Sequence, residues 1–144
     1  MARGLVYKGS LNGTAPIYRE FPVNASQTIK EGDVVVLSGG KASGAADGAT
    51  AGTVLGVSNT SITTGATPGP NDKIKVDINP HSIYEATYIG SATPTIGAKY
   101  DLGTVAYQFD ADDTTDGFIQ VVGNVDTTNK KADVILTNRV FTGV

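Results

Sequence analysis

Asp33-Val34-Val35-Val36-Leu37, followed by Ser38-Gly39-Gly40, is the stretch of the chain that decides its fold. Its apolar residues are continuous, and the three valines are β-branched, which favours a strand. A short apolar run without polar alternation is typical of a strand that is covered on both faces. The serine and two glycines that follow it indicate a tight turn.

Similar short runs recur between glycines and prolines, of which the chain has 18 and 6. This punctuation leaves no room for a long helix. The run at 73–78 alternates polar and apolar residues strictly, so we expect it to be half-buried with Lys73 and Lys75 outward. Further predicted strands are residues 53–57, 83–89, 118–122 and 132–137. The pattern predicts an all-β fold, a single small antiparallel β-barrel or β-sandwich domain with long loops.

Residues 1–27 lie outside this regular spacing of strands. Their aromatic residues alternate with glycines and prolines, which interrupt regular strand pairing. We expect an extended N-terminal arm or an irregular first strand over residues 1–27, ahead of a β-barrel or sandwich domain over residues 28–144. An edge strand packed on the core is the alternative for this segment. The small-residue tract 38–52 predicts a long loop or a hairpin with a weak strand at Lys41–Ser43, and the stretch 60–72 predicts a second long loop.

The balance of charges excludes several classes of function. The 144 residues include 11 Lys and Arg against 14 Asp and Glu, a net charge of −3, and the isoelectric point is near 4.9. A duplex-binding domain usually carries a clustered basic face and an isoelectric point above roughly 9, so we expect no nucleic-acid partner. No apolar stretch has the length of a secretory signal or a membrane span, so we expect no membrane partner.

Residue types that carry chemistry are scarce. The chain has no cysteine and one histidine, which excludes disulfides, thiol nucleophiles and cysteine-ligated metals. The histidine, His81, adjoins Ser82, but neighbouring residues of a strand point to opposite faces and make a poor catalytic pair. We therefore expect no enzyme activity, no catalytic residue and no cofactor.

Residues 110–117 (DADDTTDG) form the most acidic stretch. From Asp112 they follow the start of a calcium loop, with Gly117 at the sixth position, but Gly123 stands where a bidentate glutamate belongs. A solvated turn with side-chain-to-backbone hydrogen bonds is the competing interpretation. We expect the turn and no metal site, with cation binding by residues 110–116 left open at this stage.

Three segments each carry a short motif that is found in a known protein family. Ile29 to Leu37 (IKEGDVVVL) precedes a small-residue loop and then Thr53 to Ser58 (TVLGVS), and Pro94 to Leu102 reads PTIGAKYDL. The Gly-Asp step before a strand, the Leu-Gly-Val step and the P-x-x-G-x-x-Y-x-L spacing resemble the capsid decoration, or cement, proteins of tailed bacteriophages and prophages.

The resemblance implies a structural virion protein that binds the outer surface of a phage capsid and stabilises the mature shell. It implies a homotrimer, the major capsid protein as partner, and a place on the virion after synthesis in the host cytoplasm. Tyr, Phe and Arg are enriched at interface centres. We expect the N-terminal segment to contact the capsid or a neighbouring protomer through the residues Arg3, Tyr7, Tyr18, Arg19 and Phe21.

A carbohydrate- or receptor-binding β-module on a virion or cell surface is the alternative function. Such sites commonly place exposed aromatic residues beside acidic ones. Tyr100, Tyr107 and the acids of 110–116 would supply them.

Overall fold

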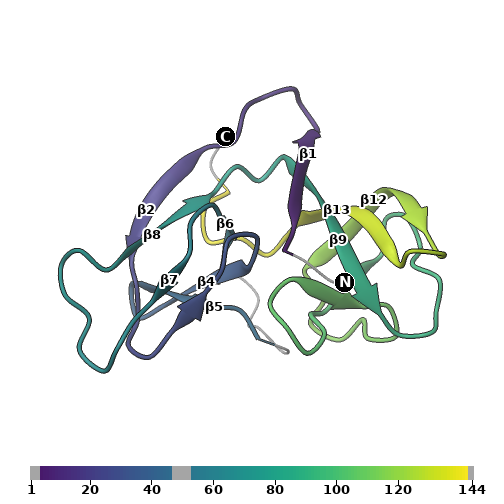
Figure 1. Cartoon of the computed structure of the whole chain (residues 1–144). Coiled ribbons are helices and arrows are strands. Elements are labelled where there is room, and N and C mark those ends of the chain that lie inside the picture. The colour runs from purple at the N-terminus through teal and green to yellow at the C-terminus, as the bar shows by residue number, and fades with distance from the viewer. Residues whose placement is uncertain (1–3, 47–52, 143–144) are drawn as a thin grey trace.

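Every regular element of the protein is a β-strand in the part of the chain that the computed structural model describes, residues 4–46 and 53–142 (Figure 1). The predicted all-β, largely antiparallel fold is confirmed. In these residues no sheet closes into a barrel, and two sheets pack in a sandwich-like arrangement. No helix long and apolar enough to cross a membrane occurs within these two ranges.

The first sheet combines the first strand with strands from the second half of the chain. Its order is β1-β9-β13-β12-β10, all antiparallel, and β11 pairs with β9 in parallel. The strands are β1 (Val6–Ser10), β9 (Ser82–Ile89), β10 (Lys99–Tyr100), β11 (Gln108–Asp110), β12 (Ile119–Asp126) and β13 (Lys131–Leu136).

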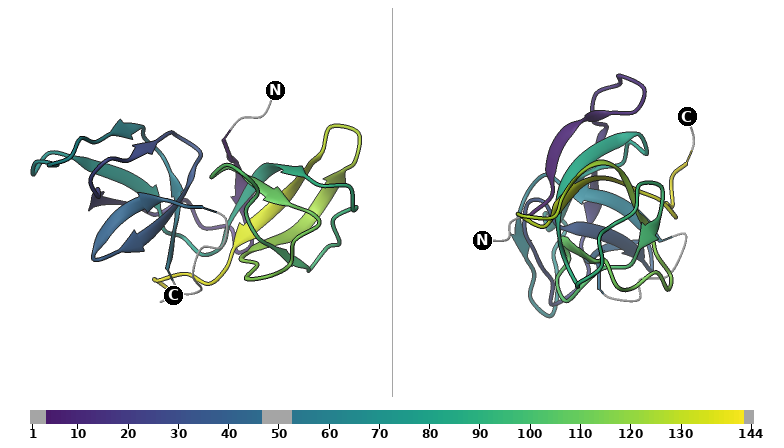
Figure 2. Two further views of the ribbon diagram at one scale, coloured as in Figure 1. Left: turned by 90° about the horizontal axis from the view of Figure 1, so that it is seen from below. Right: turned by 90° about the vertical axis from the view of Figure 1, so that its right-hand side faces the viewer.

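The second sheet, on the left in Figure 1, is antiparallel throughout with the order β2-β8-β6-β4-β5. Its strands are β2 (Tyr18–Pro22), β4 (Val34–Ser38), β5 (Lys41–Gly44), β6 (Val54–Ser58) and β8 (Lys73–Asp77). A short pair, β3 (Thr28–Ile29) and β7 (Ile62–Thr63), accompanies it. Seen from below, the two sheets form two lobes (Figure 2).

Strand β4 is buried from both sides, as the run from Asp33 to Leu37 predicts. Val34 contributes to a core shared by the two sheets, in which it joins Tyr84 of β9. Val35 faces the opposite way, into a second core with Leu55. Burying a valine side chain fully stabilises the fold by about 2 kcal/mol. Both cores therefore depend on this strand.

Strand β8 has the alternation that its sequence predicts. Ile74 and Val76 are fully buried in the second core, and Lys73 and Lys75 are exposed. The two predicted loops also hold short strands, because β5 lies in the tract 38–52 and β7 lies in 60–72. Residues 47–52 of the first loop lie outside the described part.

The N-terminal segment supplies an edge strand to each sheet. β1 pairs with β9 in the first sheet, and β2 pairs with β8 in the second. The connections between these strands also run side by side, since Leu11 N donates to His81 O at 2.9 Å and Ile78 N donates to Ile17 O at 2.8 Å. The described residues of 1–27 thus hold two paired edge strands, where the sequence predicts an arm, one irregular strand or, as the alternative, an edge strand packed on the core.

Candidate functional site

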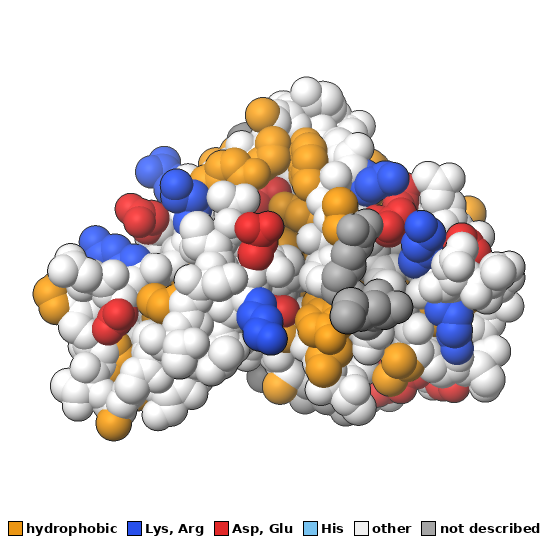
Figure 3. Space-filling view, in the orientation of Figure 1, with side chains coloured by type: hydrophobic (Ala, Val, Ile, Leu, Met, Phe, Trp, Pro, Cys, Tyr) orange, Lys and Arg blue, Asp and Glu red, His pale blue; other side chains and the backbone are white. Residues whose placement is uncertain are grey.

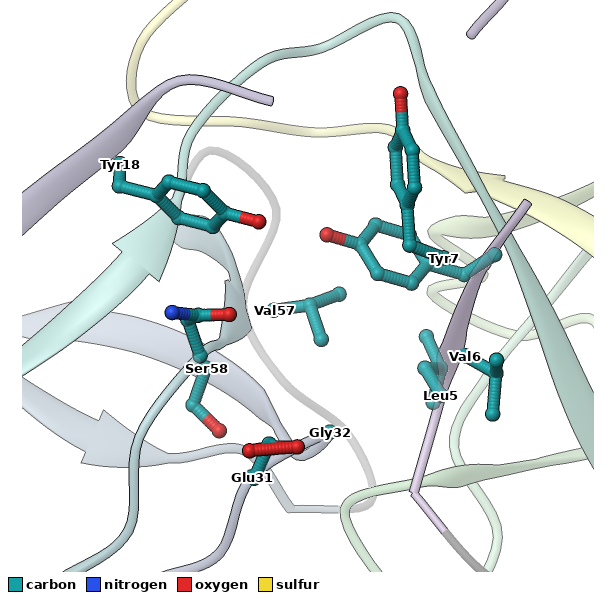
Figure 4. Close-up of a pocket in the computed structure, with 10 residues that line it drawn as sticks. Leu5, Val6, Tyr7, Tyr18, Glu31, Gly32, Val57 and Ser58 are labelled. Carbon is teal, nitrogen blue, oxygen red and sulfur yellow. The ribbon is translucent and has the colours of Figure 1, made fainter. Parts of the chain in front are cut away.

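Two of the five residues predicted to make contacts, Tyr7 and Tyr18, meet at one pocket (Figure 4). The pocket has a volume of about 200 Å³ and lies between the edge strands β1 and β2. Tyr7 comes from β1 and Tyr18 from β2, and they are 39% and 45% exposed. The Tyr18 ring points across the pocket toward β1. The two sheets therefore bring these aromatic residues to a single site.

The other three predicted residues do not share this pocket. Arg3 lies outside the described residues. Arg19 and Phe21 are on the opposite face of β2 from Tyr18, because successive strand residues alternate. Phe21 packs on the second core and stacks on Phe141 with ring centroids 6.1 Å apart, and Arg19 is exposed. Of the three predicted contact residues on β2, Tyr18 thus lies on one face and Arg19 and Phe21 lie on the other.

The turn between β3 and β4 forms a rim of the pocket and carries Glu31 (Figure 4). Leu5 N donates to Gly32 O at 2.8 Å, and Gly32 N donates to Ser58 O at 2.9 Å. A Cβ added to Gly32 would lie 2.6 Å from the Cα of Gly4, and the φ of Gly32 is +91°. Only glycine fits this close contact with this backbone conformation. The backbone next to Glu31 is therefore held from two sides.

Tyr84 also lines the pocket and belongs to a buried polar network between the sheets. Its hydroxyl donates to Asp77 Oδ2 at 2.5 Å. Asp77 Oδ1 accepts the backbone N–H groups of Ile17 and Asn79, each at 3.0 Å. Burial, reinforced by the hydrogen bond and the charge of Asp77, raises the pKa of Tyr84 far above its usual range.

Arg139 is the cation of this network and is 5% exposed. Its Nε donates to Leu136 O at 3.0 Å, and its Nη1 donates to Leu55 O at 2.9 Å. Burial lowers the pKa of Arg139 to about 10, and the negative charge of Asp77 acts against that shift. The two opposite charges thus compensate each other in part within the core.

The network fixes the connection between β1 and β2 from beneath. Asn79 is buried, and its Nδ2 donates to Thr14 Oγ1 and to Ala15 O, both at 2.9 Å. Asp77 holds the end of the connection, next to β2, by accepting the backbone N–H of Ile17. The side chains that this connection displays therefore stand on an ordered backbone.

Large hydrophobic side chains that remain exposed concentrate on this part of the molecule. The described residues include six of them, and four belong to the stretch 7–18: Tyr7, Leu11, Ile17 and Tyr18. We call these four residues the apolar patch. Hydrophobic side chains gather at the top of the molecule in Figure 3, over β1, β2 and their connection.

A second hollow, with a volume of about 450 Å³, lies beside the same connection. The residues that line it are Asn12, Thr14, Ala15, Pro16, Ile17, Asn79, Pro80 and His81. His81 donates its backbone N–H to Asn79 Oδ1 at 3.0 Å, and its side chain is half-buried, whereas Ser82 is fully buried. The two neighbouring side chains thus differ in burial, because that of His81 is partly accessible to solvent and that of Ser82 is not.

The acidic stretch 110–117 is a turn whose carboxylates accept backbone hydrogen bonds. Asp112 accepts the N–H groups of Ser91 and Ala92, each at 2.9 Å, and Asp110 accepts that of Asp112 at 2.9 Å. The bonds from Ser91 and Ala92 lower the pKa of Asp112 below its ordinary value. Within residues 4–46 and 53–142, no group of three or more metal-ligating side chains is arranged to hold an ion.

Of the two aromatic residues proposed for sugar binding, Tyr100 is buried and Tyr107 is half-buried. Tyr100 is 5% exposed, stacks on Phe109 with ring centroids 5.5 Å apart, and accepts a hydrogen bond from Thr95 N. Tyr107 is half-buried against the same core. The expectation of an exposed aromatic side chain at Tyr100 is therefore wrong.

The sequence alone does not indicate Glu31, Asp77, Asn79 or Arg139 as parts of the site. Asp77 offers one signal, because it is the acidic residue at the end of an alternating strand. A comparison with known proteins found no family model that matches the chain and no curated protein with significant similarity to it.

Proposed function

We propose that the protein is a structural virion protein that binds the outer surface of a bacteriophage capsid and stabilises the mature shell, as a decoration or cement protein. The observation that carries the proposal is the apolar patch, which gathers four of the six exposed large hydrophobic residues of the described chain. Contiguous exposed apolar surface of this kind marks interaction sites. The resemblance of residues 29–37, 53–58 and 94–102 to decoration proteins supports the same function.

The edge strand β2 offers a second means of attachment. It pairs with β8 on one side, and on the other side Val23, directly after the strand, bridges to Ala42 of β5 while the strand itself has no second partner among the described strands. An extended segment of the major capsid protein would add to this edge through backbone hydrogen bonds, with the apolar patch supplying side-chain contacts. Such β-strand addition needs neither a catalytic residue nor a cofactor.

The proposed assembly is a homotrimer on the capsid surface. A trimer engages three copies of the major capsid protein at once, so that weak single contacts add to strong retention. The protein would be made in the host cytoplasm and would act on the virion.

Co-sedimentation with mature and immature shells tests this function. We expect the protein to sediment with the mature shell and the double variant Leu11→Ser/Ile17→Ser to lose most of this binding. Ile96→Ser is the matched control, because Ile96 is 64% exposed but lies outside the apolar patch. Failure of the unmodified protein to sediment with either shell, or equal retention of the double variant, contradicts the proposal. A glycan-array signal without capsid affinity would favour the carbohydrate-binding alternative.

A further inference from the structure

We propose that the pocket between Tyr7 and Tyr18 receives the guanidinium group of an arginine side chain that the partner protein carries. The identity of that partner rests on the proposed function. The chemistry of the pocket rests only on the residues that line it.

The size of the pocket fits one side chain. Its volume is about 200 Å³, whereas pockets for small-molecule ligands hold roughly 300–1,000 Å³. It opens beside the apolar patch, to which both tyrosines belong. A protein surface that covers the patch would therefore place its own side chains at the mouth of the pocket.

The charge of the pocket favours a cation. Glu31 is the one charged side chain among the described residues that line it. Neither ion pair found between described residues involves Glu31. The pKa of Tyr18 is raised, first by burial and then by the negative charge of Asp77, with a smaller contribution from Glu31. Glu31 thus gives the pocket a negative charge that is complementary to a positively charged partner group.

The polar groups around the pocket have bonding capacity to spare. Besides the Glu31 carboxylate, they are the Tyr7 and Tyr18 hydroxyls and the Asn59 side-chain amide. None of these four groups forms a hydrogen bond with another described residue. Each contains an oxygen that can accept a hydrogen bond. The site therefore offers several acceptors to a ligand with many donors.

Guanidinium fits this set better than ammonium does. It is planar, lies flat on aromatic rings, and presents five N–H donors, two of which can bind one carboxylate. In Figure 4, Tyr18 lies on one side of the pocket, Tyr7 on the other, and Glu31 at the rim. An arginine that enters between the rings can stack on an aromatic face and bind the carboxylate together.

The rim that carries the carboxylate is already ordered. The Gly4–Gly32 contact and the hydrogen bonds of Gly32 to Leu5 and Ser58 hold its backbone. A preformed site loses less conformational entropy on binding than a mobile one. The backbone that carries Glu31 is thus in place before the partner arrives.

Titration of the whole protein with Nα-acetyl-arginine amide, followed by NMR, tests the pocket without a capsid. We expect saturable shifts of the backbone amide signals of Glu31, Gly32 and Asn59. Glu31→Gln keeps the shape but removes the charge, and should weaken binding about tenfold, the loss of one charge-assisted contact. Glu20→Gln is the matched control, because Glu20 is an exposed acid on β2 outside the pocket, and its affinity should stay unchanged.

Four outcomes overturn the proposal. They are the absence of shifts with the arginine compound, equal shifts with the apolar Nα-acetyl-norleucine amide, equal or tighter binding of Nα-acetyl-lysine amide, and unchanged binding by Glu31→Gln. Shell sedimentation separates the two proposals. A protein that sediments with shells but shows no arginine shifts supports the proposed function and contradicts the arginine pocket. A protein that shows arginine shifts but does not sediment with shells supports the pocket and contradicts the proposed function.

Discussion

The hydroxyl of Tyr84 donates a 2.5 Å hydrogen bond to Oδ2 of Asp77, and this bond joins β9 of one sheet to β8 of the other. Tyr84 is 5% exposed and Asp77 is 1% exposed. A buried carboxylate oxygen that loses its donor keeps its full desolvation cost. The bond therefore contributes to the junction between the two sheets.

Tyr84→Phe should lower the free energy of unfolding by about 2 kcal/mol, because it leaves a buried oxygen of Asp77 without this donor. Urea denaturation measures the change. Tyr7→Phe is the control and should change stability by less than about 0.5 kcal/mol, since the Tyr7 hydroxyl has no hydrogen-bond partner among the described residues. Equal stability of the two variants would contradict this role of Tyr84.

The same residue makes stability depend on alkaline pH. Below pH 10.0, the ordinary pKa of tyrosine, the folded and unfolded chains both keep the proton, so the contribution of Tyr84 is constant. Above it, the unfolded chain releases the proton while folded Tyr84 retains it, so the free energy of unfolding falls as pH rises. Urea denaturation between about pH 9 and about pH 11 should show this decline, and Tyr84→Phe should reduce its slope. Identical slopes would exclude Tyr84 as the source.

Gly56 sits where β6 crosses closest to β8. A Cβ at this position would lie 1.8 Å from Asp77 O, and 3.2 Å from Nη1 of Arg139. Gly56→Ala must push the two strands apart and should cost about 3 kcal/mol or more in thermal or urea unfolding. Gly65→Ala is the control, because an added Cβ there meets nothing within 4 Å. If Gly56→Ala were as stable as Gly65→Ala, β6 and β8 could separate without cost, and the prediction would be wrong.

Calcium at millimolar concentration should leave the melting temperature unchanged. The carboxylate of Asp112 is already engaged with Ser91 N and Ala92 N, and Asp110 accepts the N–H of Asp112. A ligand that binds the folded chain raises its melting temperature by mass action. Differential scanning calorimetry with and without calcium decides the matter, and a concentration-dependent rise would establish a cation site in residues 110–116.

Light scattering of the purified protein should give the mass of three chains. The proposed multivalent attachment requires three copies held together. A trimer agrees with that assembly, and a mass of one chain at micromolar concentration would contradict it.

The strands were predictable because their signals are local. The valines of β4 and the alternating lysines of β8 each encode a burial pattern within five residues, and the structure has both patterns. Turn-forming glycines mark where such runs end. The all-β class follows from these short-range features.

The partition into two sheets and the buried network were not predictable in this way. Asp77 and Arg139 are far apart in sequence, and apart from the place of Asp77 at the end of an alternating strand, nothing near them in the sequence signals that they are buried. Glu31 becomes part of a pocket only because β1 and β2 enter different sheets. Local patterns do not encode such long-range pairing, which depends on the assembled fold.

The paired connections between the sheets have a mechanical consequence. Residues 11–17 and 78–81 span the same boundary, and the bonds Leu11–His81 and Ile17–Ile78 cross-link them. A force that pulls the lobes apart is therefore shared by these two backbones and by the segment after β13, which hydrogen-bonds to Val54 of β6. A protease that cuts residues 11–17 would leave the lobes tethered through 78–81, and the severed N-terminal piece would still be held by the pairing of β1 with β9.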